Sequence, residues 1–221
     1  MKIKLLVFCA ALLLFGTTIS AQIYERANLW QKEIDAFAEI DRRQTPPEKA
    51  ILFVGSSSFR GWRTLRDDFP RVKIINRAFG GAHLEDVIFY AAQTIAPYQA
   101  QTIVVYAGDN DIAAGKSVER VFNDWQTLVA LIRQSAPQSH IVFVSIKPSP
   151  SRREFWSKFQ QMNALVKAQT VKDKRLIFVD IWNEMLTANG EPREELYLGD
   201  RLHMKPEGYA IWRAALAKYL K

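Results

Sequence analysis

Apolar positions along this chain follow two patterns, short continuous runs and longer spaced stripes. The short runs are rich in β-branched residues and almost unbroken, as expected for parallel strands that are covered on both faces. We predict five buried strands, at Ala50–Gly55, Val72–Asn76, Thr102–Gly108, Ile141–Ile146 and Leu176–Asp180.

Between these runs, apolar side chains recur every three or four residues, which is typical of amphipathic helices. Such stripes begin at Trp30, Leu84, Val118, Phe155 and Tyr209, and their aromatic residues are interpreted as core. Alternating strands and helices with right-handed crossovers predict an α/β protein, a three-layer α/β/α sandwich around a five-stranded parallel sheet. No repeat, low-complexity tract or long linker interrupts the pattern, so we expect one domain over 22–221.

The amino terminus has the pattern of a secretory signal peptide. Two lysines within Met1–Lys4 precede the apolar stretch Leu5–Phe15, and small residues lead to Ala21. The apolar stretch is shorter than the roughly 20 residues that span a bilayer. We therefore expect that residues 1–21 are removed, that the protein is exported to the periplasm or the extracellular space, and that no integral membrane segment remains.

Composition narrows the chemistry. The single cysteine, Cys9, lies in the predicted signal peptide, which excludes disulfides and cysteine nucleophiles from the mature chain. Since the three histidines are dispersed, we expect no metal site, and no motif indicates a cofactor. The formal net charge is +7, but the basic residues are scattered, so nucleic-acid binding is not expected. Nothing indicates the oligomeric state.

Three polar, glycine-containing turns follow the first three predicted strands. They are Gly55–Ser58, Gly80–His83 and Gly108–Asp111. In open parallel sheets, ligands bind beyond the carboxyl ends of the strands, so these turns are expected to share one edge. Glycines allow tight turns that aim backbone N–H groups into a cleft. Each turn alone is unspecific, but their joint placement predicts a functional site.

A serine hydroxyl becomes a useful nucleophile when a base takes its proton, so the histidines matter. His140 precedes the fourth predicted strand and should lie at the opposite edge, in a structural role. His83 lies at the correct edge, with carboxylates only on the helix that follows it. His203 directly precedes a helix that Pro206 announces, and Asp200 stands three residues before it. A turn at that spacing can join carboxylate and imidazole, as a Ser-His-Asp system needs.

In order along the chain, these segments resemble the four sequence blocks of the SGNH hydrolases, the GDSL-type esterases and lipases. The nucleophile, glycine, Gly-x-Asn-Asp and Asp-x-x-His blocks correspond to Val54–Ser58, Asn76–Gly81, Gly108–Asp111 and Asp200–His203. The resemblance extends from about Ile51 to Gly208. It implies a flavodoxin-like SGNH hydrolase fold and a carboxylic ester hydrolase that needs no cofactor.

The resemblance also implies roles. Ser57 would be the nucleophile, His203 the base and Asp200 the group that orients it. The N–H of Ser57, the N–H of Gly81 and the side-chain amide of Asn110 would form the oxyanion hole. Three such donors would stabilise the tetrahedral oxyanion of ester hydrolysis without a metal.

Two assignments depend on alignment with the family blocks. Ser56 and Ser58 compete with Ser57 as nucleophile, and Gly80 competes with Gly81 as oxyanion donor. Ser56 also departs from the family, which usually has aspartate there; that aspartate is not a catalytic group.

Substrate expectations come from the short loops between the blocks, which leave no room for an inserted lid. An open cleft and a small acyl group favour short-chain, acetyl esters on a carbohydrate or cell-envelope glycan. A lysophospholipase or thioesterase that acts on lipid acyl esters is the alternative, and a non-catalytic glycan-binding module is the alternative from another class. Four aromatic residues are candidates for the cleft or the core: Phe59, Trp62, Phe79 and Tyr106.

Overall fold

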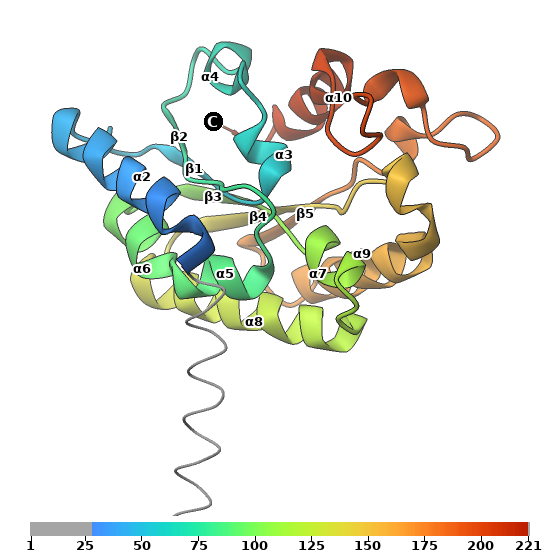
Figure 1. The fold of residues 1–221 in the computed structure, drawn as a ribbon. Coiled ribbons are helices and arrows are strands. Elements are labelled where there is room, and N and C mark those ends of the chain that lie inside the picture. The colour runs from blue at the N-terminus through green and yellow to red at the C-terminus, as the bar shows by residue number, and fades with distance from the viewer. Residues whose placement is uncertain (1–27, 221) are drawn as a thin grey trace, which may run out of the picture.

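A five-stranded, all-parallel sheet forms the centre of the computed structural model, which describes residues 28–220 (Figure 1). The strand order is β2-β1-β3-β4-β5, so the chain moves from β1 outward to the edge strand β2, returns past β1 to β3, and then continues to β4 and β5. The strands are β1 Ile51–Gly55, β2 Ile74–Asn76, β3 Thr102–Tyr106, β4 His140–Val144 and β5 Leu176–Val179.

Helices connect consecutive strands. The α-helices are α2 Gln31–Arg43, α3 Ser57–Arg60, α4 Leu65–Asp68, α5 Leu84–Phe89, α6 Ala91–Thr94, α7 Asp109–Ala113, α8 Val118–Ser135, α9 Trp156–Thr170 and α10 Pro206–Leu216. Short 3-10 helices are η1 Asn28–Trp30, η2 Ala96–Tyr98, η3 Pro150–Phe155, η4 Asn183–Met185 and η5 Glu194–Leu196. Within residues 28–220, no helix is both long enough and apolar enough to cross a bilayer.

Two hydrophobic cores lie on opposite faces of the sheet. Leu52 and Val54 point into the core that α2, α5, α8 and α9 cover, whereas Phe53 points into the core under α3, α4 and α10. Successive side chains of a strand alternate between faces, so a strand with both faces covered is apolar throughout. This arrangement confirms the predicted three-layer α/β/α sandwich around five parallel strands.

The predicted element boundaries differ in two informative places. The third strand was expected to reach Gly108 but ends at Tyr106, because Gly108 adopts the left-handed conformation (φ +106°) that starts α7. The stripe from Leu84 was expected to form one helix, yet the backbone leaves helical geometry at Tyr90 (φ −91°, ψ 6°). Tyr90 is fully buried and packs edge-to-face against Phe79, so tertiary packing accounts for this break.

Candidate active site

A sharp turn after β1 places Ser57 at the carboxyl edge of the sheet. Gly55 has a φ of +126°, and a Cβ atom there would lie 2.0 Å from the backbone oxygen of Tyr106. Only glycine fits such an approach. The N–H of Ser56 then donates to the same oxygen at 2.9 Å, and α3 begins at Ser57.

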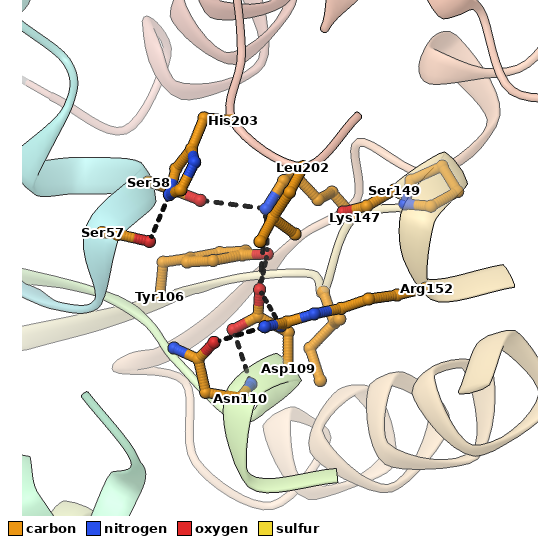
Figure 2. A network of polar contacts seen from close by, with 12 residues as sticks. Ser57, Ser58, Tyr106, Asp109, Asn110, Lys147, Ser149, Arg152, Leu202 and His203 are labelled. Atoms are coloured by element: carbon orange, nitrogen blue, oxygen red, sulfur yellow. Dashed lines mark hydrogen bonds and ion pairs between the residues drawn. The ribbon is translucent and has the colours of Figure 1, made fainter. Parts of the chain in front are cut away.

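Ser57, His203 and Asp200 form one hydrogen-bonded chain. The Oγ of Ser57 lies 2.9 Å from Nε2 of His203, and Nδ1 of His203 lies 2.5 Å from Oδ2 of Asp200. Figure 2 marks the contact between Ser57 and His203 with a dashed line. The loop between η5 and α10 supplies both of the latter residues, as the three-residue spacing predicted. The arrangement lets the imidazole accept the hydroxyl proton while the carboxylate holds its opposite nitrogen.

Asp200 is held as a carboxylate. Burial acts to raise its pKa, but hydrogen bonds from the His203 side chain and from the backbone N–H groups of Leu202 and His203 outweigh burial and lower the pKa to about 2. Both backbone bonds are 2.9 Å long and end on Oδ1, which leaves Oδ2 for the imidazole. Asp200 therefore carries a full charge near neutral pH and can stabilise an imidazolium.

The structure distinguishes the three neighbouring serines. Ser58 is 2% exposed, and its Oγ accepts a hydrogen bond from Nζ of Lys147 at 3.0 Å. Ser56 is fully buried, and its Oγ has no hydrogen-bond partner within the described part of the chain. Ser57 alone of the three contacts His203, so the geometry favours it as the nucleophile.

Two backbone N–H groups at the carboxyl edge of the sheet are available as donors to an oxyanion. Neither the N–H of Ser57 nor that of Gly81 donates a hydrogen bond to any residue in 28–220. The N–H of Gly80, in contrast, donates to Oε2 of Glu33 at 3.2 Å. Gly81 has a φ of +71°, the left-handed conformation that turns the chain here. The geometry therefore favours Gly81 over Gly80 as the donor.

The side-chain amide of Asn110 is held at both ends. One N–H of its Nδ2 donates to the backbone oxygen of Ala82 at 3.0 Å, and its Oδ1 accepts from Nη2 of Arg152 at 2.7 Å. An amide nitrogen carries two N–H donors, so a second remains for a substrate. Asn110 lies in α7, directly after the turn at Gly108.

The other two histidines lie elsewhere. His140 begins β4, at the opposite edge from Ser57, as predicted. His83 is buried at the start of α5, and its Nδ1 lies 3.9 Å from Oε1 of Glu85 and 3.9 Å from Oδ1 of Asp111. The contact with Asp111 was not foreseen. Between residues 28 and 220, no group of three or more histidine, cysteine, aspartate or glutamate side chains is placed to hold a metal ion.

Sequence reasoning missed two cations beneath the serine turn, Lys147 and Arg152. Nζ of Lys147 lies 3.1 Å from the hydroxyl of Tyr106 and 3.5 Å from Oδ2 of Asp109. Burial lowers the pKa of Lys147 to about 8, against the opposing effect of Asp109. Lys147 follows β4 at the same carboxyl edge as the glycine turns, so the strand-end argument applied to β4 would have found it.

The four aromatic candidates for the cleft belong to the core. Phe59, Trp62 and Tyr106 are buried on the α10 side of the sheet, and Phe79 is buried on the other side. Phe59 and Tyr106 pack edge-to-face, with ring centroids 6.0 Å apart, and Trp62 and Phe79 pack against other aromatic rings of the two cores. The structure therefore places all four in the core, one of the two roles that the sequence left open.

Solved structures share this fold. A protein from Streptococcus pneumonia with the provisional name platelet activating factor has 22% identity and a TM-score of 0.77, over 92% of this chain and 99% of that one. A GDSL-like lipase from Bacteroides thetaiotaomicron has 22% identity and a TM-score of 0.71, over 85% and 96% of the chains. A provisionally named acylhydrolase from Bacteroides fragilis has 22% identity and a TM-score of 0.72, over 81% of this chain and 92% of that one. At this identity the similarity concerns the fold alone.

Sequence comparison gives the family. A search of curated proteins found no significant match. The model of the GDSL-like lipase/acylhydrolase family, in contrast, matches residues 46–211, which include every residue of the site described above. This chain therefore belongs to the GDSL-like lipase/acylhydrolase family, as the SGNH-type blocks predicted, and it is a carboxylic ester hydrolase.

Proposed function

We propose that this protein is a serine esterase that removes short acyl groups, acetyl above all, from a carbohydrate or cell-envelope glycan through an acyl-enzyme on Ser57. The hydrogen-bonded chain from Asp200 through His203 to Ser57 carries the proposal, because it is the arrangement that activates a serine. The unengaged N–H groups of Ser57 and Gly81 and the second N–H of Asn110 supply the oxyanion donors.

The reaction runs in two halves. Nε2 of His203 accepts the hydroxyl proton while Oγ of Ser57 bonds to the ester carbonyl carbon, and the carbonyl oxygen becomes an oxyanion. The imidazolium then gives its proton to the leaving alcohol as the ester C–O bond breaks. In the second half, water gives a proton to His203 and attacks the acyl-enzyme, and His203 returns that proton to Ser57 as the acid leaves.

The surroundings of the triad support a short acyl group. None of the four aromatic side chains considered for the cleft is available to contact an acyl chain, because all four are buried. Among the large apolar side chains exposed in the described chain, Leu198 is the one in the loop between η5 and α10 that carries Asp200 and His203, which we call the catalytic loop. A long acyl chain would need a continuous apolar groove. One exposed leucine, in the same loop as the charged side chains of Asp200 and Arg201, suits an acetyl group better than a long acyl chain.

Export is part of the proposal and rests on the sequence, since the predicted signal peptide lies outside the described residues. An enzyme that deacetylates envelope glycans must reach them outside the cytoplasm. Amino-terminal sequencing of the protein recovered from the periplasm or medium should find cleavage after Ala21. Retention of the full chain in the cytoplasm would contradict export.

Labelling and substrate profiling test the enzyme itself. A fluorophosphonate probe should modify the wild type at Ser57, mapped by peptide mass spectrometry, and Ser57→Ala should abolish labelling while the matched variant Ser56→Ala retains it. Activity on p-nitrophenyl esters should fall steeply from acetate to octanoate, and acetylated glycans should lose acetate. Preference for octanoate and for lysophospholipids would instead identify a lipid acyl hydrolase. A fully active Ser57→Ala variant would refute the serine mechanism.

A further inference from the structure

A buried polar cluster lies beneath the serine turn and connects Ser58, the neighbour of Ser57, to Asn110 (Figure 2). It starts at Ser58, whose Oγ accepts from Lys147, and continues through the hydroxyl of Tyr106, which donates to Oδ2 of Asp109 at 3.0 Å. Every one of these side chains is nearly inaccessible; that of Lys147 is 1% exposed and that of Asp109 is 4% exposed. A group so deeply buried does not contact the substrate, so the cluster acts through its neighbours.

Arg152 joins this cluster to the amide of Asn110. Its Nη1 forms an ion pair with Oδ2 of Asp109 at 3.1 Å, while its Nη2 donates to Oδ1 of Asn110 at 2.7 Å. The side chain is 15% exposed, and its contact with Asp109 is an ion pair only, because Nη1 has no hydrogen-bond partner within residues 28–220. In Figure 2 the amide nitrogen of Asn110 points away from Arg152, as the hydrogen bond to Oδ1 requires.

We propose that Arg152 is a positioning residue that fixes the amide of Asn110 in the orientation needed to stabilise the oxyanion. The inference rests on the proposed serine esterase function. The oxygen and the nitrogen of an amide exchange places by rotation about one bond, and only the nitrogen can donate to an oxyanion. Because Arg152 binds the oxygen and Ala82 accepts from the nitrogen, both ends are determined before substrate arrives. Such preorganisation is the main source of oxyanion stabilisation.

The net charge of the cluster also favours stabilisation of the oxyanion by Asn110. Arg152 and Lys147 share a single buried carboxylate, Asp109, so the protonated cluster carries a net charge of plus one. Arg152 and Lys147 also lower the pKa of Asp109, against the effect of burial, which keeps it ionised. A net positive charge that touches Asn110 polarises its amide and strengthens its N–H groups as donors.

The segment that carries Arg152 is itself anchored to the catalytic loop. The N–H of Ser151 donates to the backbone oxygen of Arg201 at 3.1 Å, between Asp200 and His203. The buried hydroxyl of Tyr197 donates to the backbone oxygen of Pro148 at 3.1 Å. These bonds hold η3 against the triad, so Arg152 is placed relative to the nucleophile as well as to Asn110.

Arg152→Gln and Arg152→Lys test the role, with Arg153→Gln as the matched control. Arg153 is the next residue of η3, but it pairs with exposed Glu191 and touches no residue of the site. Removing a donor from an oxyanion hole typically costs about 10²–10³-fold in kcat. We expect Arg152→Gln to lower kcat by about 10- to 100-fold with KM changed by less than about threefold, because only the transition state uses the oxyanion contact. Arg152→Lys should restore part of that loss, and Arg153→Gln should match the wild type.

A double-mutant cycle with Asn110→Ala separates positioning from general support of the fold. Once the amide is gone, Arg152→Gln should lower kcat by no more than about threefold further, because its target is absent. Equal fractional losses from Arg152→Gln with and without the Asn110→Ala substitution would show that Arg152 does not act through the amide and would overturn the inference. So would an Arg152→Gln variant as active as Arg153→Gln.

Folding is monitored by circular dichroism and thermal unfolding of every variant. If Arg152→Gln does not fold, the same cycle is measured with Arg152→Lys, and a coupled loss of kcat supports the inference. If neither variant folds, Arg152 is a determinant of folding and the inference is wrong. Full activity of Ser57→Ala would refute the serine esterase function itself, whereas an inactive Ser57→Ala beside an uncoupled Arg152 refutes the positioning role alone.

Discussion

Replacing Asp200 with asparagine changes the triad by one atom. In the wild type, the backbone N–H groups of Leu202 and His203 each donate to Oδ1 of Asp200 at 2.9 Å, and the asparagine keeps an oxygen to accept both bonds. Its NH₂ group then faces Nδ1 of His203 where the carboxylate oxygen lay at 2.5 Å. Because an NH₂ group donates, Nδ1 must accept, and the imidazole proton moves to Nε2. The nitrogen 2.9 Å from Ser57 Oγ becomes a donor and can no longer take the hydroxyl proton.

The expected loss is large for catalysis and small for stability. A tautomer exchange of this kind lowers kcat by about 10⁴-fold in a Ser-His-Asp enzyme, or about 5 kcal/mol of activation free energy. The side chain of Asp200 is 48% exposed, so solvent screens its ion pair with His203 and the free energy of unfolding should fall by about 1 kcal/mol or less. The loss of rate therefore cannot be attributed to unfolded protein.

Steady-state hydrolysis of p-nitrophenyl acetate and thermal unfolding of the same samples measure both quantities. Asp180→Asn is the matched control, because Asp180 follows β5, is exposed and accepts a backbone hydrogen bond from Trp182 at 3.0 Å rather than one from the triad. It should remain as active as the wild type. If Asp200→Asn retains kcat within about tenfold, the carboxylate does not set the tautomer and the assigned role of Asp200 is wrong.

Three further predictions concern the turn and the cluster. Gly55→Ala should lower the free energy of unfolding, measured with urea, by about 4 kcal/mol, because its Cβ would lie 2.0 Å from a carbonyl oxygen of β3. Gly115→Ala is the control: Gly115 also has a positive φ (+91°), but no atom lies within 4 Å of the added Cβ, so we expect a loss of only about 1–2 kcal/mol. Ser56→Ala should keep kcat and raise that free energy by up to about 1 kcal/mol, since it removes a buried hydroxyl without a hydrogen-bond partner in 28–220; a lower free energy of unfolding would contradict this. Burial lowers the pKa of Lys147 to about 8. The unfolded chain therefore holds one more proton than the folded chain from about pH 8 to pH 10.4. As the pH rises through that window, the wild type should gain up to about 3 kcal/mol of stability relative to Lys147→Met; a stability difference that does not change with pH would refute the lowered pKa of Lys147.

Much of the fold and of the site was predictable because the signals are local. Continuous apolar runs identified all five strands to within a few residues, since covering both faces of a strand demands apolar side chains at every position. The three-residue spacing from Asp200 to His203 indicated their contact for a similar reason, because one turn of chain joins them. Helix boundaries were less accurate, as the break at Tyr90 illustrates, because distant packing partners decide them.

Local sequence patterns were enough to predict the order of strands and helices along the chain, the fold class and the meeting of three glycine-containing turns at one edge of the sheet. The folded structure was needed to show that Ser57 rather than Ser58 faces the imidazole, and that Lys147 pairs with Ser58 and Arg152 with Asn110. Lys147 reaches Ser58 across 89 positions, and Arg152 reaches Asn110 across 42. The pattern along the chain can place Lys147 at the end of β4, but it does not contain the pairing of buried charges, because that pairing depends on which side chains the packed sheet brings together.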